Sequence, residues 1–163
     1  MKEIIDKISS YNLFNYLFPG IIFVVLLRQL TSFDLILEND FLGAFLYYFI
    51  GLVISRIGSL IIEPIFRKIK LVKFSEYKDF IDATKADNKV ELFSEINNTY
   101  RTLASLFFCL LFCILYDRLL FNILSNYNIN TYTITIGLLI LFVFSYKKQT
   151  GYINKRIEKN KSK

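Results

Sequence analysis

Residues Phe41–Ile62 read FLGAFLYYFIGLVISRIGSLII, an apolar run that contains a single charged residue, Arg56. About 20 such residues in a helix cross the hydrocarbon core of a bilayer, which is roughly 30 Å thick. Three more stretches are similarly apolar, although the last is near the lower limit of length: Leu13–Leu30, Thr102–Leu124 and Tyr132–Tyr146. Apolar residues gathered in blocks are typical of membrane proteins. The sequence therefore predicts an all-α fold, a single membrane domain over residues 1–163 with four membrane-spanning helices.

The basic residues are distributed unevenly around these stretches. The chain has 20 Lys and Arg and a net charge of +6, and seventeen of the 20 lie in residues 1–12, 66–101 and 147–163. Because Lys and Arg concentrate in cytoplasmic loops, we expect both termini to be cytoplasmic, with residues 147–163 forming a basic tail. The bias toward Ile, Asn, Lys, Tyr and Phe suggests a bacterial source, so the predicted location is a bacterial inner membrane.

The polar segment 66–101 is expected to form a cytoplasmic helical hairpin between the second and third spans. Its second helix is predicted to continue without a break into the third span. One interpretation is a solvated connection between two spans; the other is a docking surface for a soluble partner, since exposed apolar residues mark interaction sites. The residues expected to dock this partner are Tyr77, Phe80, Ile81, Leu92, Phe93 and Ile96.

Pro19 lies within the first apolar stretch, and Pro64 lies two residues after the second. Proline removes a helical hydrogen bond and bends a helix, so the first span either starts at Pro19 or is kinked there. The residue before a proline disfavours helix, which predicts a break or kink near Glu63, before Pro64.

Small and polar residues repeat every four positions in the second span: Gly51, Ser55, Ser59 and Glu63. Small residues at this spacing let two helices approach closely, so the simplest interpretation is a packing seam. Arg56 lies beside the seam, and a buried charge needs a partner or a route to the headgroups. Snorkelling, pairing with Glu63, Asn15 or a neighbouring subunit, and a role in a pore or ligand site all remain open.

The third span carries a matching stripe of Ser105, Cys109, Cys113 and Asp117. The two cysteines are expected to be small packing residues. Asp117 and Arg28 are predicted at similar depth near the outer boundary, and we expect them to form an ion pair.

Catalytic and cofactor signatures are absent from the sequence. With no histidine, a Ser–His or Cys–His nucleophile is excluded, and no nucleotide-binding or metalloprotease motif occurs. We therefore expect no enzyme activity, no cofactor and no metal site. The basic residues lie beside membrane segments without a nucleic-acid-binding motif, so the expected contact is the lipid bilayer rather than nucleic acid.

The whole chain resembles, in architecture, the small four-pass membrane subunits of bacterial anti-phage systems, such as the Kiwa membrane subunit and the accessory membrane protein of type VI-B CRISPR systems. The shared features are the four spans, the mixed-charge segment Phe66–Arg101, the basic tail and the opening Tyr11–Gly20. The resemblance implies a homo-oligomer that senses or perturbs the inner membrane and docks a cytoplasmic effector, with no site residues carried over.

Two other functions remain open from the sequence. One is a pore-forming or membrane-disrupting effector, which would need several copies. The other is a small transporter, although small four-pass exporters carry a buried glutamate in the first span and Leu13–Leu30 has none.

Overall fold

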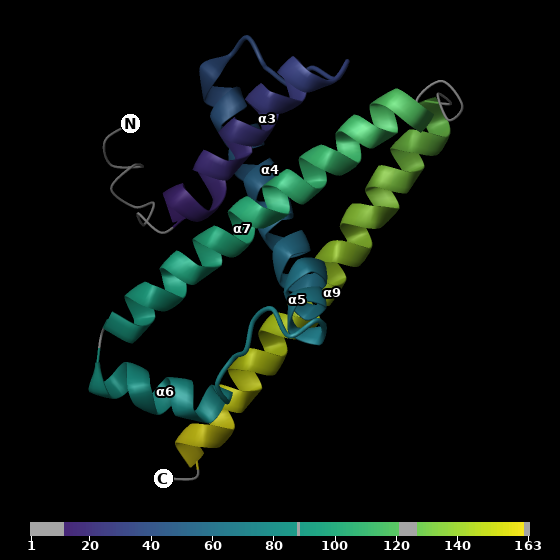
Figure 1. Ribbon diagram of the computed structural model, residues 1–163. Coiled ribbons are helices and arrows are strands. Elements are labelled where there is room, and N and C mark those ends of the chain that lie inside the picture. The colour runs from purple at the N-terminus through teal and green to yellow at the C-terminus, as the bar shows by residue number, and fades with distance from the viewer. Residues whose placement is uncertain (1–11, 88, 121–126, 162–163) are drawn as a thin grey trace.

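The computed structural model describes residues 12–87, 89–120 and 127–161, and the regular elements within these ranges are all helices (Figure 1). Within these ranges, three continuous helical stretches are long and apolar enough to cross a membrane: Leu13–Leu30, Asp40–Lys68 and Lys89–Leu119. The predicted all-helical fold is therefore confirmed, together with three helices of membrane-spanning length.

The fourth predicted span, Tyr132–Tyr146, is the apolar part of a longer helix, α9 (Tyr127–Lys161). The expected basic tail is helical as far as it is described, because α9 continues to Lys161. Helix α9 is not among the three stretches of membrane-spanning character, so its passage through a membrane stays a prediction. The last residues of the predicted third span, 121–124, lie outside the described residues.

All three long stretches combine α-helix with a π-helical turn, and in the first two this turn precedes a proline. The first consists of η1 and α3, and the second consists of α4, η2 and α5. Their bounds are Leu13–Leu17 (η1), Phe18–Leu30 (α3), Asp40–Ile57 (α4), Gly58–Ile62 (η2) and Glu63–Lys68 (α5).

The π-helical turns η1 and η2 each end two residues before one of the two prolines. The amide of Phe18 donates to Leu13 O before Pro19, and the amide of Glu63 donates to Gly58 O before Pro64. A proline ring clashes with the carbonyl four residues earlier, and a wider turn relieves that clash without ending the helix. The first span therefore begins before Pro19, and the break predicted near Glu63 is a π-helical turn in an unbroken helix.

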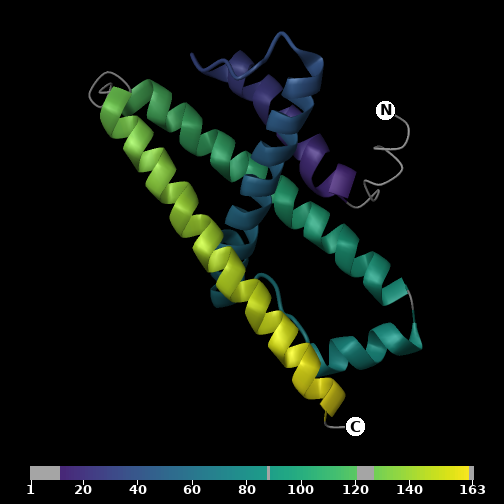
Figure 2. The same ribbon diagram turned by 180° about the vertical axis from the view of Figure 1, so that it is seen from behind.

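Helices α3, α4 and α7 (Lys89–Leu115) share one small hydrophobic core. Phe23, Val24 and Leu27 of α3 pack with Ile54 of α4, and α7 contributes two leucines, Leu106 and Leu110. Helix α9 contacts mainly α4 and η2, and the Phe49 and Phe142 rings stack with centroids 6.1 Å apart. The fold is thus a three-helix core with α9 against one side (Figure 2).

Two glycines bring the backbones of the first two long helices together. A methyl group built on Gly51 would overlap the carbonyl oxygen of Tyr16, and one built on Gly20 would overlap that of Tyr47. No side chain fits between the helices at this point, which is the close approach that small residues allow. Gly58 is similarly placed against the Ser105 hydroxyl of α7.

At the end of the molecule where α5 stops, a short helix spans the space between two long ones. Helix α6 (Tyr77–Ala86) runs from the start of α7 toward the C-terminal part of α9, as both views show (Figures 1 and 2). The Tyr77 ring lies 5.7 Å from the Tyr152 ring of α9. The two helices of the expected hairpin therefore diverge, and α6 forms a bridge to α9. As predicted, the second helix continues into the third apolar stretch, because α7 runs into η3 (Tyr116–Leu120) without a break.

Replacing Gly51 by alanine tests the close helix contact. The added methyl group must push α4 away from η1, and overpacking of this kind costs about 1–3 kcal/mol. We expect Gly51→Ala to lower the thermal unfolding temperature of the detergent-purified chain.

The matched control is Gly151→Ala in α9, where an added methyl group meets nothing within 4 Å. Alanine is the better helix former by roughly 0.8–1 kcal/mol, so this variant should be neutral or slightly more stable. Equal destabilisation by both substitutions would contradict the packing assignment.

Candidate functional site

A buried polar cluster joins the three core helices. The Asn15 amide lies 3.4 Å from the Ser55 hydroxyl, and the Thr102 hydroxyl lies 2.8 Å from Asn15 Oδ1 and 3.2 Å from Ser55 Oγ. None of the three residues is more than 1% exposed. A side-chain hydrogen bond between two membrane helices stabilises the fold by only about 0.6 kcal/mol. The main effect of this cluster is therefore to fix the register of the three helices.

Arg56 has a partner inside the chain. Its guanidinium donates to the Tyr16 hydroxyl at 3.2 Å, and Tyr16 is nine-tenths buried at the end of η1. The side chain also lines a large cavity that is described below. Of the partners expected for Arg56, the structure supplies neither Glu63 nor Asn15, and the phenol takes their place.

Glu63 is the centre of a larger charged cluster at the open end of the bundle. Its carboxylate is 7% exposed and lies 2.7 Å from Arg101 of α7, 3.1 Å from Arg67 of α5 and 3.7 Å from Lys148 of α9. One carboxylate therefore contacts three cations from three helices. We call Glu63, Arg67, Arg101 and Lys148 the Glu63 cluster.

Lys148 is held from two directions. Its ammonium donates to the Ser59 carbonyl at 2.6 Å and to the Ser59 hydroxyl at 2.8 Å. Burial lowers the pKa of Lys148 from its usual value; the Glu63 carboxylate opposes this shift, and the Arg101 and Arg67 guanidinium groups add to it. Contacts with Ser59 and Glu63 therefore stabilise the charged ammonium against the effect of burial.

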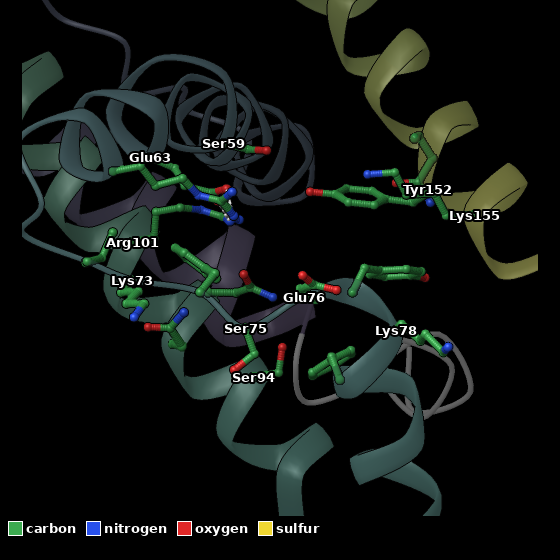
Figure 3. A pocket seen from close by; sticks show the side chains of 18 of the residues that line it. Ser59, Glu63, Lys73, Ser75, Glu76, Lys78, Ser94, Arg101, Tyr152 and Lys155 are labelled. Carbon is green, nitrogen blue, oxygen red and sulfur yellow. Dashed lines mark hydrogen bonds and ion pairs between the residues drawn. The ribbon is translucent and has the colours of Figure 1, made fainter. Parts of the chain in front are cut away.

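An open cavity of about 1550 Å³ extends from the Glu63 cluster. Figure 3 shows Glu63 and Arg101 on one side, Tyr152 and Lys155 of α9 on the other, and Ser75, Glu76 and Lys78 along the third. The basic lining residues are Arg56, Arg67, Lys73, Lys78, Arg101 and Lys155, and the acidic ones are Glu63, Glu76 and Glu158. The cavity is thus polar and carries an excess of positive charge.

The seam predicted in the second span faces its neighbours along its whole length. Gly51 meets η1, Ser55 meets Asn15 and Thr102, Ser59 meets Lys148, and Glu63 meets the cations of its cluster. All four residues are buried. The four-residue period therefore follows one continuous packing face.

The predicted ion pair between Arg28 and Asp117 does not form. Both residues lie in the described part of the chain, and Arg28 instead pairs with the nearby Asp34 at 3.3 Å. Asp117 accepts one hydrogen bond from the backbone amide of Ser32, at 3.2 Å, and another from the Ser32 hydroxyl. Asp117 thus anchors the Thr31–Asn39 connection to η3 through neutral donors.

The expected docking residues divide into two groups. Ile81 is 1% exposed, and Tyr77 and Phe80 are half-buried, so these α6 residues pack inside the molecule. The expectation that Ile81 docks a partner is therefore wrong, because its side chain already has a buried place. The α7 residues remain exposed: Leu92 by 53%, Phe93 by 62% and Ile96 by 40%.

Sequence reasoning missed Arg101, Thr102 and Lys148 as site residues. Arg101 is the last charge before the third apolar stretch, and Lys148 comes two residues after the fourth. Glu63 directly follows the second stretch. Glu63, Arg101 and Lys148 therefore all lie at the predicted cytoplasmic boundary of the membrane. That shared depth was the available signal for the Glu63 cluster.

Comparison with protein families, curated proteins and solved structures finds no match for this chain. Its function is therefore inferred from the geometry of its own residues.

Neutralising Glu63 tests the charged cluster. In Glu63→Gln the three cations lose their counter-charge and repel one another. Breaking a buried ion pair costs about 3–5 kcal/mol. Arg67 is half-exposed and adds little because solvent screens it, so we expect a loss of roughly 2–4 kcal/mol. Denaturant unfolding of the detergent-purified chain measures this loss.

Glu91→Gln is the control, because Glu91 is an exposed carboxylate in the first turn of α7. Its removal costs only the interaction with the helix dipole, about 0.3–1 kcal/mol. A Glu63→Gln chain as stable as Glu91→Gln would contradict the role given to the cluster.

Proposed function

We propose that the protein is an oligomeric anchor and sensor in a bacterial inner membrane that docks a soluble cytoplasmic partner. It crosses the membrane four times, with both termini in the cytoplasm. The orientation is supported by the concentration of Lys and Arg in residues 1–12, 66–101 and 147–163. In keeping with the architectural resemblance, the proposed setting is anti-phage defence.

The observation that carries the docking proposal is the exposed face on the N-terminal part of α7. Leu92, Phe93, Ile96 and Tyr100 lie at helical spacing, and 40–67% of the surface of each is left exposed by the described residues. The opposite face of the same turns, with Ser94, Asn97 and Asn98, lines the cavity. Contiguous apolar surface next to polar residues is what a partner protein covers.

Oligomer formation is supported by the surface of α9. Apolar residues point outward over its predicted membrane-spanning part: Ile134, Ile136, Leu139, Ile140, Val143 and Phe144, each 51–64% exposed. Lipid or a second copy of the chain would cover such a surface, and Gly137 on the same helix leaves open space for close approach.

The pore and transporter alternatives receive no comparable support. Arg56 suggested a pathway through the membrane, but it has the Tyr16 hydroxyl as a partner. The buried Asn15, Ser55 and Thr102 side chains satisfy one another, so they do not call for a transported ion or solute.

Membrane recruitment of a candidate partner tests the docking proposal. The soluble product of the neighbouring gene is expressed with and without this chain, and its share in the membrane fraction is measured. We expect the intact chain to bring it into the membrane fraction. Phe93→Glu should release it, because a carboxylate placed in an apolar interface loses its water without gaining a partner.

The matched control is Ile153→Glu, which places the same charge on an exposed apolar position of α9. Recruitment should survive this change. Recruitment that is equally strong with Phe93→Glu would refute the α7 face as the docking site. Loss of membrane potential on expression of the chain alone would favour the pore alternative.

A further inference from the structure

The Glu63 cluster carries more positive charge than its single carboxylate can balance. Glu63 already contacts Arg67, Arg101 and Lys148, and its side chain is 7% exposed. The Nε atom of Arg101 is buried and has no hydrogen-bonding partner in the described part of the chain. A buried donor without an acceptor is costly, so its presence points to an acceptor that the described residues do not supply.

The nearby cations add to this excess. Among the described residues, the partner of Arg56 is a neutral phenol, that of Tyr16. Lys73 and Lys78 project from the segment around the start of α6. Lys155 lies on the opposite side, across the cavity from Arg101 (Figure 3). The negative charge of Glu76 and Glu158 offsets only part of the total, since the lining holds six basic and three acidic residues.

The remaining lining is suited to a ligand with several oxygen atoms. The neutral side chains of Ser75, Ser94, Asn97 and Asn98 supply hydrogen-bond donors along α7 and the start of α6. Tyr77 and Tyr152 form a stacked aromatic pair on the α9 side. Guanidinium groups bind phosphate oxygens with paired, charge-assisted hydrogen bonds, which makes arginine-rich sites selective for phosphate.

We infer that this cavity binds a phosphate-bearing ligand, whose phosphate lies among Arg101, Arg67 and Arg56. The inference is independent of the proposed docking function. Two sources share this chemistry: the headgroup of an anionic phospholipid and a soluble phosphate compound. Glu63, Arg101 and Lys148 lie at the ends of apolar stretches, where phospholipid headgroups are expected.

The test uses the full chain, purified in a neutral detergent and stripped of lipid. In one arm it is offered a mixture of phosphatidylglycerol and phosphatidylcholine, and bound lipid is counted by native mass spectrometry. In the other arm sodium pyrophosphate is added, and its affinity is measured by calorimetry against sodium chloride of equal ionic strength. Selective retention of phosphatidylglycerol identifies a lipid headgroup, and tight pyrophosphate binding identifies a soluble phosphate.

The first variant is Arg101→Gln, which should weaken whichever ligand binds. Because Arg101 also supports the fold, the second is the double variant Lys73→Gln/Lys78→Gln, which removes two exposed lining charges. Each lost cation should weaken binding about fivefold. The matched control, Lys68→Gln/Lys147→Gln, removes two exposed charges that do not line the cavity and should bind as tightly as the unaltered chain.

Two results would overturn the inference. One is that neither phosphatidylglycerol nor pyrophosphate binds in preference to its control. The other is that Lys68→Gln/Lys147→Gln weakens binding as much as Lys73→Gln/Lys78→Gln, which would assign the attraction to general surface charge.

Discussion

A single buried carboxylate, that of Glu63, joins three helices. It contacts Arg101 of α7 and Lys148 of α9 while remaining on the end of the second long helix. Outside this cluster α9 has few contacts with the other helices, mainly with α4 and η2. The cavity between α6, α7 and α9 exists because the cluster fixes the positions of α7 and α9. Without the Glu63 carboxylate, the three cations would repel one another. The cavity and the exposed α7 face therefore both depend on this carboxylate.

The two prolines determine where the polar side chains of this bundle point. A helix that continued regularly through Pro19 or Pro64 would clash with its own carbonyl groups, and the π-helical turns η1 and η2 remove that clash. A π-helical turn rotates the residues on either side of it relative to a regular helix. Asn15 lies on η1, and Ser59 lies on η2 with Glu63 directly after it. These are the residues that hydrogen-bond across helices, so the turns that accommodate the prolines also position the polar contacts.

Periodicity and composition are sufficient to predict the helices and the packing face, but not the partners across helices. The four-residue spacing from Gly51 to Glu63 defines one face of a helix, and that face is buried. Spacing cannot say which neighbour the face meets, which is why Lys148 was missed. Similar depth suggested that Arg28 would pair with Asp117, yet Asp34, six residues away, is reached at a lower entropic cost. Ile81 was predicted to be exposed because an amphipathic pattern alone does not distinguish a partner from another part of the same chain.

Cross-linking between α4 and α9 tests most directly whether Glu63 holds α9 in place. Phe49 and Phe142 are replaced by cysteine in a chain whose native Cys109 and Cys113 are serine, and the membranes are treated with a flexible bismaleimide that links two thiols. Because the two rings are stacked with centroids 6.1 Å apart, we expect the α4–α9 cross-link to form, and Glu63→Gln should lower its yield sharply. A cross-link that forms equally well with Glu63→Gln, or that never forms, would contradict the account.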